Sequence, residues 1–277
     1  MTRRYVITGA GSGIGAAAAR LLRESGAEVV GIDLTGSDVT ADLATPEGRR
    51  DAVEAVLAAG PVDAVIASAG ISAPSPLTVS VNYYGVTELL EALLPALGRS
   101  AAPRVAVVSS MSSVQPNSPQ LVDALLSGTE AEARAIAEEL AADPQAGGLI
   151  YASTKRAISR WVREQSITPE WAGAGIPLNA VAPGIVTTPM TSELLASEQS
   201  TAFVDAVVPM PLNYHQPPES IASLLIWLTS PENTHCAGQT IYCDGGSDVV
   251  LRGGDAWSWA DARVGQYFQQ LTAGQPG

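Results

Sequence analysis

Tyr151 and Lys155 stand four positions apart in the run Tyr151-Ala152-Ser153-Thr154-Lys155. On a helix this spacing places both side chains on one face. A tyrosine hydroxyl ordinarily has a pKa of about 10, and a nearby positive charge lowers that pKa by favouring the phenolate. The pair is therefore a candidate acid/base device. Such pairs also occur on ordinary solvated helix faces, so the meaning of this one depends on the elements that hold it.

The segments around this pair alternate between short β-branched runs and longer runs rich in alanine and leucine. Predicted strands cover Tyr5–Thr8, Glu28–Asp33, Val62–Ala69, Arg104–Ser109, Pro177–Val181 and Gln239–Cys243; predicted helices cover Ala16–Ser25, Pro46–Ala59, Tyr83–Leu97, Tyr151–Gln165 and Glu219–Leu228. This alternation, with continuously apolar strands, predicts an α/β doubly wound parallel sheet, or Rossmann fold. Because no repeat or low-complexity linker interrupts the chain, we expect a single domain over residues 1–277.

Two segments stand outside this alternation. Residues 113–148 form a predicted helical insert, with helices over Pro119–Leu126 and Thr129–Ala142, the second beginning with capping-box spacing between Thr129 and Glu132. Residues 249–277 form a C-terminal extension that is rich in aromatic side chains. We expect this extension to pack on the body or on a partner subunit.

The composition excludes several functions. The chain has 28 acidic and 15 basic residues and a net charge of −13, which repels nucleic acid and anionic membranes. No apolar run is long enough for a membrane span and no secretory signal is recognisable, so we expect a cytoplasmic protein. Cys236 and Cys243 are too few for a zinc motif or a disulfide framework, which predicts reduced thiols and no metal.

A glycine-rich loop, Thr8-Gly9-Ala10-Gly11-Ser12-Gly13-Ile14-Gly15, lies between the first predicted strand and helix. A glycine loop can be a plain flexible connection, but this context is typical of dinucleotide binding. Gly9 would allow the tight turn, Gly13 the approach of the pyrophosphate, and Gly15 close packing of helix on strand. The N–H groups at the helix start, near Ser12 and Ile14, would bind the phosphates.

Asp33 ends the second predicted strand, roughly 20 residues beyond the glycine loop. An acidic side chain at this place accepts hydrogen bonds from the adenosine ribose and repels a 2′-phosphate, which favours NAD over NADP. Five further residues follow the next coil and strand and would border the adenine and ribose: Asp42, Leu43, Ser68, Ala69 and Gly70. For Asp42, ordinary loop chemistry is an equally good explanation.

Several motifs occur in the order typical of short-chain dehydrogenases/reductases, which the chain resembles from residue 1 to about residue 250: Thr8-Gly9 with Gly13 and Gly15, Ala67-Ser68-Ala69-Gly70, Asn82, Ser109-Ser110, Tyr151 with Lys155, and Pro183-Gly184. The long interval between Ser110 and Tyr151 makes it most similar to the 3α-hydroxysteroid dehydrogenase/carbonyl reductase branch. Coniferyl-alcohol dehydrogenases share many of these features.

The resemblance implies a role for each polar residue. Tyr151 would be the general acid/base, and Lys155 would lower its pKa and bind the nicotinamide ribose. Ser110 would hydrogen-bond the substrate oxygen, and it is preferred to Ser109 because the family uses the second serine and strand neighbours face opposite sides. Asn82 would hold a water that links Lys155 to solvent. Ser110 could instead cap a strand end, and Asn82 could simply occupy a helix kink.

After a later predicted strand, the sequence resembles the nicotinamide-side loop of the family. The resemblance implies cofactor contacts from Pro183, Gly184, Ile185, Val186 and Thr188, with Thr188 and the backbone near Ile185 or Val186 holding the carboxamide. A turn built of proline and glycine needs no such role by itself.

The substrate should contact loops at the carboxyl ends of the strands, here Ile71–Pro76, Met111–Val114 and Met190–Gln216. The last loop is apolar, which suits a hydrophobic alcohol or ketone such as a steroid or an aryl alcohol. His215 in this loop has no evident partner and is expected at the surface. We expect a homodimer or homotetramer, the insert favouring the dimer by obstructing tetramer contacts. Two alternatives are a catalytically silent NAD-binding regulator and a sugar epimerase of the extended branch.

Overall fold

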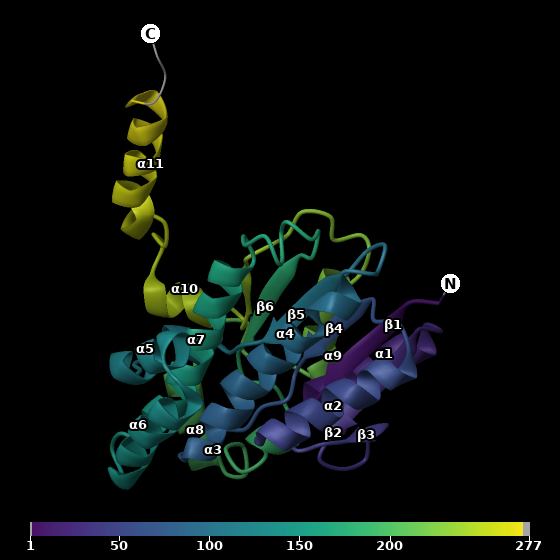
Figure 1. Ribbon diagram of the computed structural model, residues 1–277. Coiled ribbons are helices and arrows are strands. Elements are labelled where there is room, and N and C mark those ends of the chain that lie inside the picture. Colours follow the sequence, from purple (N-terminus) through teal and green to yellow (C-terminus); the bar gives the residue numbers. More distant parts are fainter. Residues whose placement is uncertain (1, 274–277) are drawn as a thin grey trace.

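The computed structural model describes residues 2–273, so Met1 and the last residues of the extension, 274–277, lie outside the described part (Figure 1). Seven parallel strands form one sheet in the order β3-β2-β1-β4-β5-β6-β7. The strands are β1 Arg4–Thr8, β2 Glu28–Asp33, β3 Val39–Thr40, β4 Ala64–Ala67, β5 Arg104–Val108, β6 Leu178–Pro183 and β7 Thr240–Cys243. The predicted doubly wound α/β fold is confirmed, although the two-residue strand β3 was not predicted.

Helices cover both faces of this sheet (Figure 1). On one face lie α1 Gly13–Glu24 and α9 Pro218–Leu228; on the other lie α2 Pro46–Ala59, α4 Gly85–Leu97 and α7 Gly148–Gln165. Strand alternation explains the two cores, because Val6 packs in one and its neighbours Tyr5 and Ile7 pack in the other. Both faces are apolar, as expected of a covered parallel sheet.

The strand order reverses between β1 and β4, which pair in parallel from Tyr5 and Ala64 onward. The chain runs from β1 to β2 and β3 on one side and then returns to β4 on the other. In open α/β sheets the crevice beyond the carboxyl ends of the strands, at such a switch point, is where ligands bind. The glycine loop after β1 and the segment Ser68–Gly70 after β4 meet there.

The helix predicted over Tyr83–Leu97 begins earlier than expected. Helix α3, Pro76–Val79, continues through a π-helical turn, η1 Ser80–Tyr84, into α4. The π turn contains Asn82, and its side chains Ser80, Tyr83 and Tyr84 are buried. π turns inside helices occur often at functional sites, because they displace one residue from the regular helical pattern.

The insert contains the two predicted helices. After a 3₁₀ turn, η2 Met111–Val114, come α5 Pro119–Ser127 and α6 Glu130–Ala142. The predicted capping box is confirmed, since Thr129 N donates to Glu132 Oε2 over 2.7 Å and Glu132 N donates to Thr129 Oγ1 over 3.3 Å. Figure 1 shows both helices beside α7 and α3.

Past β6 the chain forms a 3₁₀ turn, η3 Pro189–Thr191, and helix α8 Glu198–Val207. The C-terminal extension comprises α10 Ser247–Arg252, η4 Ser258–Ala260 and α11 Asp261–Ala273. Figure 1 shows α11 standing away from the body. The expectation that the extension packs on the body or on a partner subunit therefore stays a prediction for its partner-subunit part. Trp257 and Trp259, which precede α11, are 75% and 71% exposed.

Candidate functional site

A cavity of about 450 Å³ opens at the carboxyl ends of β1, β2, β4, β5 and β6. Most of the residues expected in a dinucleotide and catalytic site line it: Gly9, Ser12, Gly13, Ile14, Asp33, Asp42, Leu43, Ser68, Ala69, Gly70, Ser110, Tyr151, Lys155, Pro183, Gly184, Val186 and Thr188. Its size is within the usual range for a small-molecule or cofactor site. Segments distant in the sequence therefore meet in one place.

The glycine loop has no room for side chains where a dinucleotide would need close approach. Gly9 has φ of +69°, and a Cβ there would lie 2.9 Å from Ala69 N. A Cβ on Gly15 would overlap the carbonyl oxygen of Gly9, so Gly15 serves the packing of α1 against β1 and does not itself line the cavity. Together with the N-terminus of α1, this bare backbone fits a pyrophosphate.

Asp33 holds its carboxylate at the end of β2. Its Oδ2 accepts a hydrogen bond from Gly11 N over 2.9 Å, and its Oδ1 accepts one from Leu34 N over 2.7 Å. Among the described residues that line the cavity, Lys155 is the only basic one, and it lies next to Tyr151. The carboxylate therefore faces no cation that would pair with a 2′-phosphate.

The next wall is the turn that begins at Asp42. Asp42 Oδ1 accepts a hydrogen bond from Ala44 N over 2.9 Å, and the Asp42 side chain is exposed. Leu43 is buried, with 6% exposure, and lines the cavity together with Ala44. Asp42 therefore stabilises its own turn, as the structural explanation of this residue requires, and it also borders the cavity.

Tyr151 and Lys155 face the cavity from one turn of α7, and Lys155 Nζ lies 5.6 Å from the centre of the Tyr151 ring. Lys155 Nζ donates to the carbonyl oxygen of Val108 at the end of β5 over 2.9 Å. Burial raises the pKa of Tyr151, and a hydrogen bond with Ser110 acts in the opposite direction. Burial lowers the pKa of Lys155 to about 8. The phenol, the ammonium and the serine hydroxyl form one local set.

The two neighbouring serines have different surroundings. Ser109 Oγ donates to Lys155 O over 3.1 Å and lies 2.7 Å from Ser159 Oγ, so it ties the end of β5 to α7. Ser110 Oγ accepts a hydrogen bond from Ser112 N over 3.1 Å. The Ser110 hydroxyl also forms a hydrogen bond with the Tyr151 side chain. Ser110 follows the end of β5 and caps η2, so both the structural role and the proposed substrate contact stay open to it, and the preference for Ser110 over Ser109 stays a prediction.

Asn82 lies in the π turn and is almost fully buried, with 1% exposure. Its amide bridges the backbone of Ile71, accepting from Ile71 N over 2.8 Å and donating to Ile71 O over 2.9 Å. A Cβ on Gly70 would lie 3.2 Å from Asn82 Oδ1 and 3.6 Å from Lys155 Nζ, so all three meet at one point. Asn82 thereby fixes the segment that follows β4 beside Lys155.

The loop after β6 covers the glycine loop. A Cβ on Gly13 would lie 3.3 Å from Thr188 Cγ2, and Thr188 N donates to Thr191 Oγ1 over 3.1 Å. Ile185 does not line the cavity: it is buried with 5% exposure, and its N–H points to Met210 Sδ at 3.4 Å. The other four predicted residues of this loop line the cavity.

The predicted substrate loops contribute unequally. Ile71 and Met190 line the cavity, whereas Met111 is buried in the core with 1% exposure. In the last loop Phe203 is 70% exposed, and Met210 and Tyr214 line a separate hollow next to β7. Phe203 lies on the exposed surface of α8, and Met210 and Tyr214 lie after the helix beside β7, so most of the predicted apolar wall is absent from the cavity.

The expectation that His215 lacks a partner is wrong. His215 Nε2 lies 2.7 Å from Asp205 Oδ1, ten residues earlier in the chain, so the pair joins α8 to the end of the loop. The contact could not be read from the sequence because it depends on how the loop folds back after α8.

Sequence reasoning missed several apolar residues that line the cavity, among them Ile32, Leu34, Leu77, Val81 and Val108. Ile32, Leu34 and Val108 lie at the ends of β2 and β5, where a ligand-facing position could have been expected. Leu77 and Val81 lie on α3 and the π turn, which begin before the predicted helix. They give the cavity an apolar side.

Metal and disulfide chemistry have no counterpart in the part of the chain that the structure describes. Residues 2–273 contain no group of three or more His, Cys, Asp or Glu side chains arranged to hold a metal ion. Cys236 and Cys243 are free thiols, and burial raises the pKa of both. No described helix is both long and apolar enough to cross a membrane.

Comparison with protein families gives two matches. Residues 3–122 match a family model described as short chain dehydrogenase, and residues 141–248 match one described as enoyl-(acyl carrier protein) reductase. The chain is 38% identical over 254 residues to the 3-alpha-hydroxysteroid dehydrogenase/carbonyl reductase of Comamonas testosteroni, covering 89% of this chain and 97% of that protein. It is also 29% identical to the coniferyl-alcohol dehydrogenase of Pseudomonas sp. strain HR199, covering 88% and 96%.

Solved structures give the same picture. The 3-alpha-hydroxysteroid dehydrogenase from Pseudomonas sp. B-0831, crystallised with NADH, superposes with a TM-score of 0.81 at 37% identity, covering 90% of this chain and 98% of that one. The similar proteins thus match the body almost completely, and the second family match stops at residue 248, where the extension begins.

Proposed function

Because the chain belongs to the short-chain dehydrogenase/reductase family and is therefore an oxidoreductase with a nicotinamide cofactor, we propose that it interconverts a hydrophobic alcohol and its carbonyl compound with NAD. The observation that carries the proposal is the meeting of Ser110, Tyr151 and Lys155 in the cavity that Asp33 and the glycine loop also line. A purely regulatory NAD-binding protein would not need this set.

The residues that line the cavity fit both the adenosine side and the nicotinamide side of NAD. The bare backbone of Gly9 and Gly13 and the N-terminus of α1 would hold the pyrophosphate, and Asp33 would accept hydrogen bonds from the adenosine ribose. Pro183, Gly184, Val186 and Thr188 would hold the nicotinamide side. When bound, the nicotinamide supplies or accepts the hydride.

The proton would be handled by Tyr151. During ketone reduction its hydroxyl would donate a proton to the substrate oxygen, and during alcohol oxidation the phenolate would take it back. Ser110 would donate a hydrogen bond to the same oxygen, where charge develops. The Lys155 ammonium would stabilise the phenolate and bind the nicotinamide ribose. Asn82 holds the neighbouring backbone of Ile71, and it would also hold a water that connects Lys155 with solvent.

The substrate we propose is a steroid-like or aryl alcohol or the matching ketone. Leu77, Val81, Val186 and Met190 give the cavity an apolar side, and Met190 is 48% exposed and free to contact a bulky ligand. The similar proteins named for 3-alpha-hydroxysteroids and for coniferyl alcohol support this class.

The function is tested with a substrate panel monitored by NADH absorbance, with NAD and NADP run side by side. Steroid and aryl alcohols should react faster than small polar alcohols, and NAD should exceed NADP by about tenfold or more in kcat/KM, since Asp33 repels the 2′-phosphate. A clear preference for NADP would contradict the role of Asp33. Faster turnover of small polar alcohols would contradict the substrate class.

The proton transfer is tested with Tyr151→Phe. Loss of the hydroxyl should reduce kcat by at least about a hundredfold, because general acid/base catalysis typically contributes that much or more. The dissociation constant for NADH, measured by fluorescence, should change little because the ring is retained. Full turnover in this variant would refute the mechanism.

For assembly we propose a homodimer or homotetramer, with residues 1–277 acting as one domain. The insert lies beside α7 and could obstruct contacts between dimers, which favours the homodimer. Sedimentation equilibrium of the full chain at micromolar concentration distinguishes these states, and a monomer would contradict the proposal.

A further inference from the structure

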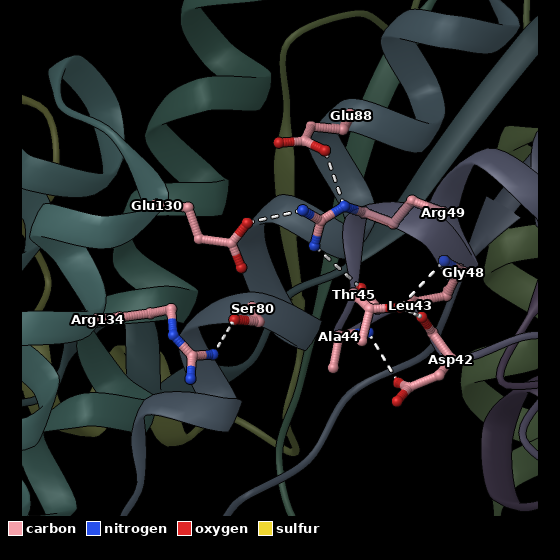
Figure 2. A network of polar contacts seen from close by, with 10 residues as sticks. All are labelled: Asp42, Leu43, Ala44, Thr45, Gly48, Arg49, Ser80, Glu88, Glu130 and Arg134. Atoms are coloured by element: carbon pink, nitrogen blue, oxygen red, sulfur yellow. Dashed lines mark hydrogen bonds and ion pairs between the residues drawn. The ribbon is translucent and has the colours of Figure 1, made fainter.

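Arg49 is a buried cation between the helical insert and the cofactor cavity. Its side chain in α2 is 4% exposed and reaches three elements, as Figure 2 shows. Arg49 Nη2 donates to Glu130 Oε2 over 2.7 Å, Nε lies 2.7 Å from Glu88 Oε2, and Nη1 donates to the carbonyl oxygen of Leu43 over 3.2 Å. Glu130 and Leu43 are hydrogen-bonded to the guanidinium, whereas Glu88 makes an ion pair with Nε without hydrogen-bond geometry. A buried charge is stable only when such partners compensate it.

The Leu43 contact links this cation to the cavity. Leu43 lines the cavity on the same turn as Asp42. Its carbonyl oxygen accepts the hydrogen bond from the Arg49 guanidinium. Of the two carboxylates, Glu130 is the better shielded, with 20% exposure of its side chain against 46% for Glu88. Glu130 therefore contributes most to fixing Arg49, because solvent screens the pair with Glu88 more strongly.

A second contact comes from the same face of α6. Arg134 follows Glu130 by one helical turn, and its Nη1 donates to Ser80 Oγ over 2.6 Å (Figure 2). Ser80 is fully buried and is the first residue of the π turn that contains Asn82. Helix α6 thus contacts Arg49, which holds the Leu43 wall, and Ser80, which begins the π turn with Asn82.

We propose that Glu130 and Arg134 are positioning residues for the cavity, Glu130 acting through Arg49 on the Leu43 wall of the dinucleotide site and Arg134 acting through Ser80 on the π turn beside the catalytic residues. The inference rests on the proposed function. Through Glu130 the insert stabilises the bound form of the Leu43 wall, so that cofactor binding and the packing of α6 are energetically coupled.

The first test compares Glu130→Gln with Glu138→Gln, which removes the same charge from an exposed position on α6. Glu130→Gln should raise the dissociation constant for NADH, measured by fluorescence titration, about fivefold, and Glu138→Gln should leave it within about twofold. Because Leu43 lies on the side of Asp33, binding of ADP-ribose should weaken by the same factor, whereas binding of nicotinamide mononucleotide should not change.

A double-variant cycle shows whether Glu130 acts through Arg49. Arg49→Lys shortens the forked contact, and the combined variant with Glu130→Gln should bind NADH no more weakly than the worse single variant. Additive losses would overturn the route through Arg49. A lowered melting temperature with unchanged NADH and ADP-ribose binding in Glu130→Gln would overturn the proposal, since it would leave only a structural role.

The second arm is tested with Ser80→Ala and Arg134→Gln. Both should lower kcat by about threefold, with the NADH dissociation constant changed less than twofold, because the π turn supports Asn82 and Lys155 rather than the Leu43 wall. Unchanged kcat in both variants would overturn this arm. If the unmodified protein binds no NADH at all, it is the proposed function that fails, and that outcome is distinct from equal binding by the protein and its Glu130→Gln variant.

Discussion

Lys155 is the only lysine in the chain, and it is 4% exposed at the wall of the cavity. Its ammonium donates to a backbone carbonyl, and no carboxylate is among the causes that shift its pKa. Burial therefore disfavours the charged form and lowers the pKa to about 8. At neutral pH the group still carries its proton, which is the form needed beside a phenolate.

This pKa can be measured directly. Reductive methylation with ¹³C-formaldehyde labels Lys155 and the terminal amine, which gives two resonances whose titration is followed by NMR. We expect the Lys155 resonance to titrate near pH 8, well below the ordinary value of about 10.4. A midpoint above pH 10 would contradict the effect of burial, and the Tyr151→Phe variant serves as the control for coupling with the phenol.

The same shift predicts a dependence of stability on pH. Because the folded pKa of Lys155 is depressed, its contribution to stability is present above the unfolded pKa and is lost as pH falls through about 8. The free energy of unfolding of the unmodified protein should therefore rise, relative to that of Lys155→Met, between about pH 8 and pH 10.4. Parallel urea titrations at both ends of this window measure the difference, and a constant difference would contradict the assignment.

At the scale of elements, α6 is held at its start by the capping box of Thr129 and Glu132. Thr129→Ala removes one cap hydrogen bond and should lower the free energy of unfolding by about 1 kcal/mol. Because α6 also carries Glu130, the variant should weaken NADH binding as well. Urea denaturation and fluorescence titration measure the two effects.

Ser118→Ala is the matched control, since Ser118 caps α5 by accepting a hydrogen bond from Leu121 N over 3.2 Å. Helix α5 carries neither of the carboxylates that pair with Arg49, so this variant should lose stability without losing NADH affinity. Equal losses of affinity in both variants would show that general destabilisation, not the position of α6, governs cofactor binding.

The sequence predicts most elements because their signals are local. Strand and helix periodicity identify six of the seven strands, and the capping box identifies the start of α6. Strand β3 has only two residues, too few for a pattern, and the π turn at Ser80–Tyr84 depends on packing against α7 and α6. The Arg49 network joins residues 81 positions apart, which no local signal can indicate.

The candidate site follows the same division. Asp33, the glycine loop, Ser110 and the Tyr151 pair were predictable because each sits at the end of a strand or on a regular helix face. The wall residues Leu77 and Val81 and the partner of His215 were not, because they depend on where an irregular helix begins and on how a loop folds back. The catalytic roles of Ser110, Tyr151 and Lys155 and the binding roles of Asp33 and the glycine loop stay predictions.

At the scale of the whole molecule, the extension begins with α10, whose Arg252 lies over the Tyr242 ring of β7, and only the part from η4 to α11 stands away from the body (Figure 1). The similar proteins from Comamonas and Pseudomonas are covered over 97% and 98% of their lengths while leaving about a tenth of this chain unmatched. Trp257, Trp259, Val264 and Tyr267 are each at least half exposed, on a segment that Figure 1 shows standing off the body. We expect exposed aromatic side chains of this kind to be covered by a partner subunit.

A chain that ends after Gly253 should therefore retain the fold and NADH binding but lose self-association. The body keeps every residue that lines the cavity, so the NADH dissociation constant should stay within about twofold of that of the full chain. Burial of several aromatic side chains contributes on the order of a few kcal/mol to an interface, and its loss should shift sedimentation toward a smaller species at the same concentration. A double substitution of Trp257 and Trp259 by alanine should act in the same direction without shortening the chain. If both variants sediment like the full chain, subunit contacts lie elsewhere on the body, and the aromatic extension has another partner.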